Sequence, residues 1–171
     1  STQGYSSAAS DVYKRQVQAQ DGVSVESDTL GALLYPLEGD TFALDMVIKP
    51  ERYHEFGIAL HVDKELETGY FLRMNPKNQL VAWDMWPRGE QGRYQWQIKG
   101  DVPYQIETAR KLPKAEEYRV HIIKEKDICV VYINDEIVLS TRMYNHKDGY
   151  AGIYVVQGNV KLIQYKEKRS E

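Results

Sequence analysis

The stretch TFALDMVIK, residues 41–49, decides the fold class of this chain. Its large apolar side chains occur at every second position: Phe42, Leu44, Met46 and Ile48. Asp45 and Lys49 occupy positions between them. Successive side chains of a β-strand point to opposite faces, so this period of two predicts a strand with one buried and one exposed face. We expect Pro50 to end the strand, because proline has no backbone N–H to donate.

The same period continues along the chain and predicts an all-β fold. We expect further strands at residues 55–62, 69–75, 79–86, 93–98, 118–124, 128–133, 136–143, 149–156 and 160–166. Asn134 and Asp135 are expected to form a two-residue hairpin turn. Short strands with turn residues at intervals of roughly 8–12 positions are typical of a two-sheet antiparallel β-sandwich. The predicted architecture is a jelly roll of the concanavalin or lectin-like type.

Composition excludes several classes of protein. The 171 residues are 42% hydrophobic, and no apolar run approaches the ~20 residues that a membrane span needs. The single cysteine, Cys129, cannot form an internal disulfide. The formal net charge of −3 and the lack of clustered Lys and Arg argue against a nucleic acid as partner. The chain therefore reads as one soluble globular domain, with neither nucleic-acid nor membrane partners expected.

The two ends of the chain differ from the patterned middle. Residues 1–20 are rich in Ser, Ala and Gln, so we expect a disordered tail there, a sandwich over residues 21–168 and a short tail at 169–171. Residues 7–16 are similar to a string at the ends of metagenomic reading frames, where it is translated adapter DNA. The natural sequence is then expected to begin near Val17, which leaves a signal peptide possible.

Polar side chains on the expected exposed face form a candidate binding surface. Successive strands contribute one each: Asp45, His61, Arg73, and either Asp84 or Trp83. Carboxylate and guanidinium groups can form paired hydrogen bonds to adjacent sugar hydroxyls. The alternative is an ordinary solvated sheet face, on which Asp45 and Arg73 form a surface ion pair of ~0–1 kcal/mol.

The three tryptophans are expected to play two different roles. Trp83 is expected on the same face of its strand as Val81 and Met85, which predicts a core position. Trp86 ends a strand and Trp96 lies in the proline-containing excursion at residues 87–114, so both are candidates to contact a ligand or a neighbouring domain. That excursion either walls a binding surface or caps an edge of the sandwich.

No cofactor is expected from the sequence. No two histidines have zinc-ligand spacing. The acidic residues 63–67 leave a structural calcium ion possible, although an exposed hairpin is the favoured interpretation.

Six stretches together resemble a known family: residues 55–63, 69–75, 78–81, 118–122, 129–142 and 149–155. They are similar to the C-terminal β-sandwich of glycoside hydrolase family 32, which contains levanases, inulinases and invertases, and to carbohydrate-binding module family 66. The resemblance implies a secreted or cell-surface bacterial module that recognises a β-fructoside or related glycan, or packs on a catalytic propeller. Fructan-binding modules also have an acidic residue at the position of Asp45. They differ at two other positions, with Arg where this sequence has His61 and Trp where it has Val156.

The resemblance does not extend to catalysis. The family's propeller supplies its acids from a Trp-Met-Asn-Asp-Pro-type stretch, an Arg-Asp-Pro and a Glu-Cys, and this sequence contains none of them. We therefore expect an accessory module that is not an enzyme. Two alternatives remain open at this point. One is a purely structural domain. The other is a lectin-like glycosidase or lyase, which would need two carboxylates, such as Asp45 and Asp84, across one cleft.

Overall fold

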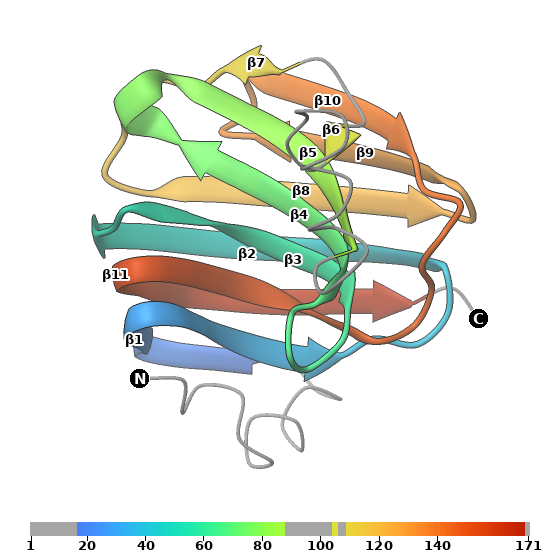
Figure 1. Cartoon of the computed structure of the whole chain (residues 1–171), viewed down its shortest axis with the longest axis horizontal. Helices are drawn as coiled ribbons and strands as arrows, with labels where there is room; N and C mark the ends of the chain where they lie inside the picture. Colours follow the sequence, from blue (N-terminus) through green and yellow to red (C-terminus); the bar gives the residue numbers. More distant parts are fainter. Residues whose placement is uncertain (1–16, 88–103, 106–108, 170–171) are drawn as a thin grey trace.

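The computed structural model describes residues 17–87, 104–105 and 109–169, which form β-strands and one short helix (Figure 1). The strands are β1 (Val17–Pro36), β2 (Thr41–Arg52), β3 (Glu55–Val62), β4 (Thr68–Asn75), β5 (Leu80–Pro87), β6 (Tyr104–Gln105), β7 (Arg110–Lys111), β8 (Tyr118–Glu125), β9 (Ile128–Ile133), β10 (Ile137–Arg142) and β11 (Tyr150–Arg169). The 3-10 helix η2 (Pro76–Asn78) joins β4 to β5. Within these residues, no helix has the length and apolarity to cross a membrane. The predicted all-β class is confirmed.

The strands form one continuous antiparallel sheet that folds over into two layers. Their order is β10-β9-β8-β2-β11-β3-β4-β5-β6, with β1 also paired to β11 and β7 to β5. The second half of β11 pairs with β2, and its first half pairs with β3. In Figure 1, β3, β4 and β5 consequently overlie β2, β8 and β9. The result is the predicted two-layer antiparallel sandwich.

Strands β1 and β11 belong to both layers and turn between them together. The β1–β11 register shifts between Ser27 and Leu30, where the Ser27 hydroxyl accepts a hydrogen bond from the Thr29 amide at 3.1 Å. An extra residue on one strand bends it and increases its twist. At the turn, a Cβ on Gly158 would lie well under 3.0 Å from backbone atoms of Arg52 and Tyr53. Only glycine therefore fits where the β2–β3 connection crosses β11.

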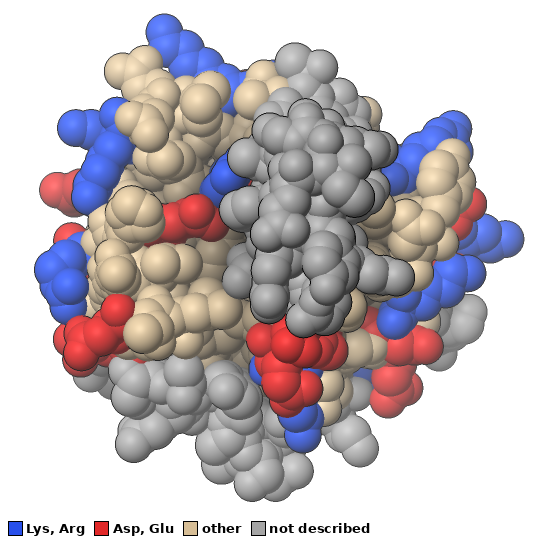
Figure 2. Space-filling model, in the orientation of Figure 1, with Lys and Arg blue, Asp and Glu red and all other residues tan. Residues whose placement is uncertain are grey.

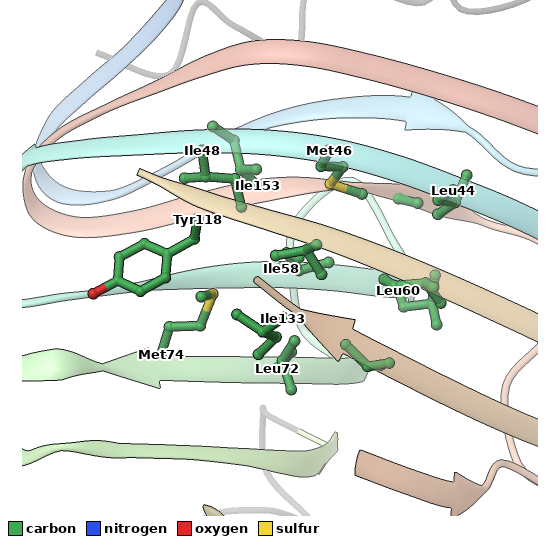
Figure 3. Close-up of a cluster of buried hydrophobic side chains, with 14 of the residues drawn as sticks. Leu44, Met46, Ile48, Ile58, Leu60, Leu72, Met74, Tyr118, Ile133 and Ile153 are labelled. Carbon is green, nitrogen blue, oxygen red and sulfur yellow. The ribbon is translucent and has the colours of Figure 1, made fainter. Parts of the chain in front are cut away.

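The core fills the space between the layers. Figure 3 shows Leu44, Met46 and Ile48 of β2 together with side chains of β3 and β4. All of these belong to one buried cluster, which also contains Trp83. Burying each such side chain contributes about 1.5–3 kcal/mol, and this is the main force that holds the layers together. The predicted core position of Trp83 is confirmed, because its side chain is fully buried.

Three local features differ from the sequence-based expectations, and a fourth expectation is not tested. The segments at 149–156 and 160–166 belong to the single strand β11. β1 begins at Val17 and so includes four residues assigned to the tail. β2 continues through Pro50, which pairs with β11. Pro50 lies beyond Tyr118, the first residue of β8, so no residue of β8 lacks a partner because of the missing proline N–H. The expected strand at 93–98 lies outside the described residues.

The β9–β10 hairpin forms where the sequence predicts it, with a loop longer by one residue. Ile133 pairs with Ile137, so the loop contains Asn134, Asp135 and Glu136. Asn134 and Asp135 have φ of +51° and +57°. Asn and Asp tolerate this left-handed conformation better than other residues with a side chain, which explains why they occupy these positions.

Replacing Gly158 tests the constraint at the turn of the sheet. We expect Gly158→Ala to lower the free energy of unfolding by about 3 kcal/mol or more, because backbone atoms must shift to admit the methyl group. Gly39→Ala is the control. Gly39 has φ +78° but no atom within 4 Å of an added Cβ, so its cost is limited to about 1 kcal/mol of backbone strain. Urea unfolding measures both, and equal losses would contradict the proposed collision.

Candidate functional site

A polar pocket lies on the outer face of β3, β4 and β5. Arg73 of β4 points to this face, because its neighbours Leu72 and Met74 point into the core. Its partners in the sheet are Gly57 on β3 and Ala82 on β5. A Cβ on Gly57 would collide with the Leu72 carbonyl group and lie 2.9 Å from the Tyr154 ring. The Tyr154 ring and the Leu72 carbonyl therefore fill the space at Gly57, whereas the small side chain of Ala82 leaves a hollow on the β5 side of Arg73.

An acid–base pair fixes the position of the Arg73 side chain. Its Nη2 atom lies 3.2 Å from Oδ2 of Asp84 on β5. The Asp84 side chain is 6% exposed, whereas that of Arg73 is 35% exposed. A buried carboxylate is costly without a positive partner, so Asp84 holds the guanidinium in place. The remaining N–H groups of Arg73 can then be directed to a ligand.

Glu55 adds an oriented hydrogen-bond acceptor at the start of β3. The hydroxyl of the buried Tyr154 donates to Glu55 Oε2 at 2.8 Å. Tyr154 is fixed in turn, because its ring packs edge-on against Phe71 with centroids 5.5 Å apart. Glu55 and Arg73 therefore form a pair of charged groups of opposite sign on neighbouring strands.

Together these groups line a pocket of about 250 Å³. The residues around it are Glu55, Arg73, Asn75, Asn78, Leu80, Ala82 and Ala109. Figure 2 shows this side of the molecule, where acidic and basic side chains meet near the middle of a mostly uncharged surface. Guanidinium and amide donors beside a carboxylate acceptor suit a small ligand with several hydroxyl groups.

Arg73 and Asp84 are brought together as predicted, but Asp45 is not with them. Asp45 lies on the outer face of the other layer, where its Oδ1 atom is 2.5 Å from His121 Nδ1. The expectation of one shared face is wrong for Asp45 because β2 and β3 follow each other in sequence but pair with different halves of β11. The same geometry excludes Asp45 and Asp84 as the catalytic pair of an enzyme, since they lie on opposite outer faces and cannot flank one cleft.

His61 is the second correction, because its side chain is buried. It has φ +55°, and the β3–β11 register contains an extra β3 residue between Ala59 and Val62. This bulge interrupts the alternation that would place His61 beside Gly57 and Ala59. The His61 Nδ1 atom donates to the Asp148 carbonyl at 2.8 Å. Burial lowers the pKa of His61 to about 4, so the ring is neutral at pH 7.

The two aromatic candidates stay predictions. Trp86 is a residue of β5, but its side chain is not described, and Trp96 lies outside the described residues. Sequence reasoning missed three polar residues of the pocket: Glu55, Asn75 and Asn78. Glu55 is two positions before Gly57 and so falls on the same outer face of the strand, which made it predictable. Asn75 and Asn78 were recognisable from the sequence only as turn residues.

The acidic loop at residues 63–67 has a structural explanation. The Asp63 Oδ1 atom accepts hydrogen bonds from the amides of Glu67 and Thr68 at 2.7 and 2.9 Å, which closes the turn between β3 and β4. Among the residues that the structure describes, no group of three or more His, Cys, Asp or Glu side chains is placed to hold a metal ion.

Comparison with known proteins identifies the fold. The sequence matches no protein-family profile and no curated protein. Among solved structures, the carbohydrate-binding module CBM66 from Bacillus subtilis superposes with a TM-score of 0.71 and 18% identity, covering 91% of each chain. A galectin of Caenorhabditis elegans superposes with a TM-score of 0.58 and 13% sequence identity, covering 92% of this chain and 98% of the galectin. An exo-inulinase from Aspergillus awamori superposes with a TM-score of 0.62 and 13% sequence identity, covering 94% of this chain but 31% of the enzyme.

These matches agree with the resemblance seen in the sequence. The expected likeness to carbohydrate-binding module family 66 and to the sandwich of family 32 hydrolases is confirmed for the fold. The lectin-like architecture is confirmed as well.

The buried His61 makes stability depend on pH. Its folded pKa of about 4 lies below the ordinary 6.5, so the unfolded chain binds a proton first and stability is lost as pH falls through this window. We expect a loss of about 2 kcal/mol between pH 7.5 and pH 5 from this residue. Urea unfolding of the wild type and His61→Asn at both pH values measures it.

The asparagine variant isolates His61, because it keeps a donor for Asp148 but does not titrate. His146, whose pKa is also lowered by burial, contributes in the same direction in both proteins. The same pH dependence in the wild type and the variant would show that His61 is not the cause.

Proposed function

We propose that this chain is a non-catalytic carbohydrate-binding module whose sugar site is the pocket around Arg73, Asp84 and Glu55. The observation that carries the proposal is the Arg73–Asp84 pair, in which a buried carboxylate positions a partly exposed guanidinium on an outer sheet face. Glu55 and two asparagines complete the pocket. The ligand is a β-fructoside or a related glycan.

The pocket suits recognition of a sugar better than chemistry on one. A glycosidase of the usual kind needs two carboxyl groups across the bond that it cleaves. Here the Asp84 carboxylate is buried against Arg73, which leaves Glu55 as the carboxylate of the pocket lining. A shallow site of this kind makes few contacts, so we expect modest affinity for a single site and stronger attachment when several modules act on one polymer.

The solved structures support the choice of fructosides as the first ligands to test. One neighbour is a carbohydrate-binding module and another is an inulinase, of which this chain spans about a third. We propose that the module belongs to a larger bacterial fructan-active glycoside hydrolase, secreted or held at the cell surface, and assists its catalytic domain.

A second candidate is a purely structural domain that packs against a catalytic propeller without binding glycan. Exposed apolar side chains on the outer face of the β8–β9–β10 layer favour it: Ile123, Ile128 and Val138. The two candidates differ in whether the isolated domain binds any glycan.

Calorimetry with levan, inulin, sucrose, xylan and β-glucan tests the proposed site. We expect binding to at least one fructan, weakened about tenfold or more by Arg73→Lys and by Glu55→Gln. Lysine keeps the charge but cannot form the paired hydrogen bonds of a guanidinium, and glutamine removes the charged acceptor.

A matched ion pair elsewhere on the surface provides the control. Arg169 lies 3.3 Å from Glu38, and its side chain is 33% exposed, close to the value for Arg73. We expect Arg169→Lys and Glu38→Gln to bind like the wild type. Binding to none of the glycans would favour the structural domain, and binding that survives both site variants would reject the pocket.

A further inference from the structure

A second polar groove lies on the opposite side of the sandwich, and its centre is a row of side chains across four strands. Lys166 of β11 pairs with Asp45 of β2, Asp45 with His121 of β8, and His121 with Tyr132 of β9. Neighbouring strands lie about 4.8 Å apart, so the row extends over roughly 14 Å. Its length suits a short oligosaccharide lying across the strands.

Asp45 and His121 form a fixed pair in the middle of the row. Because a carboxylate can only accept, the His121 Nδ1 atom donates to Asp45 Oδ1 at 2.5 Å. The two side chains are nevertheless 49% and 40% exposed. The second oxygen of Asp45 and the Nε2 atom of His121 therefore remain accessible from the groove as hydrogen-bonding groups.

Tyr132 supplies an aromatic surface beside this pair. Its ring centroid is 6.1 Å from that of His121, with 34° between the planes. Tyr132 is 37% exposed and Ile123 is 42% exposed, although both lie in the middle of a sheet face. A sugar has an apolar C–H face and an edge of hydroxyl groups. The flat Tyr132 ring can pack against the C–H face, and the oriented polar groups beside it can hydrogen-bond the hydroxyls.

Both apolar and polar side chains line the groove. The groove has a volume of about 720 Å³ and is lined by Asp45, Met46, Val47, Arg119, Val120, His121, Ile123, Tyr132, Asp135, Gln164 and Lys166. Among the polar residues, Arg119 Nη2 lies 3.4 Å from Asp135 Oδ2. Two cations and two carboxylates balance each other, so the groove does not favour a polyanion or a polycation.

We propose that this groove is a second glycan-binding site, centred on Asp45, His121 and Tyr132 and specific for a neutral oligosaccharide. It is independent of the pocket around Arg73, from which the whole thickness of the sandwich separates it. A module with sites on both outer faces can bind two glycan chains, or two segments of one chain. Such a bivalent module gains avidity on a polymer, or cross-links it, without any additional contact.

A nuclear magnetic resonance titration tests this site alone. The ¹⁵N-labelled Arg73→Lys/Glu55→Gln double variant, in which the first pocket is impaired, is titrated with neutral oligosaccharides from levan, inulin, xylan and β-glucan. We expect saturable shifts of the amides at residues 45–47, 119–123 and 130–132. Adding Tyr132→Thr should weaken this binding about fivefold or more, since it removes the ring but keeps a strand-forming residue.

Two further variants make the result decisive. His121→Asn should also weaken binding, and its spectrum reports directly whether the variant is folded. Tyr144→Thr is the matched control, because Tyr144 is 61% exposed but does not line the groove, and binding should be unchanged.

Three results would overturn the proposal. They are the absence of shifts at these amides with every oligosaccharide, shifts that Tyr132→Thr does not weaken, and shifts of the same amides with protein concentration alone. The last would identify the groove as a contact between copies of the chain. None of them bears on glycan binding at Arg73, which the calorimetry measures separately.

Discussion

The pairing of β11 with two different strands is the constraint on which the rest of the structure depends. One half of β11 completes the backbone hydrogen bonds of β2, and the other half completes those of β3. Buried backbone groups must be paired, so this arrangement fixes which strands belong to which layer. It also places consecutive strands on opposite sides of the core. Gly158 is essential to it, because the β2–β3 connection passes directly over that residue.

The two outer faces that result have different chemistry. On the β3–β4–β5 side, the small Ala82 beside Arg73 leaves a hollow, and a buried acid orients the Arg73 guanidinium. On the β2–β8–β9 side, larger side chains stand in a row and surround the exposed Asp45–His121 pair. The first face suits a compact ligand and the second an extended one. Each arrangement follows from which residues the sheet register brings opposite one another.

The fold could be predicted from the sequence, and the site only in part. Alternation at Phe42, Leu44, Met46 and Ile48 is a local signal that packing preserves, so the strands and the inward faces were predictable. Arg73 and Asp84 meet because β4 and β5 form a simple hairpin. Asp45 could not be placed, since nothing in β2 or β3 reveals that β11 lies between them. His61 could not be placed either, because the bulge depends on a register set by β11.

The two long strands that close the sheet also determine when this domain can fold. β1 pairs with β11 along its whole length, from Val17 opposite Tyr165 to Pro36 opposite Tyr150. These partners lie at the two ends of the chain, so the contact order is high and folding is slow compared with that of a helical domain of similar size. During synthesis, β1, β2 and β3 leave the ribosome long before their common partner β11. Their edges stay open until β11 has been synthesised, which makes chaperone protection of the nascent chain valuable for this architecture.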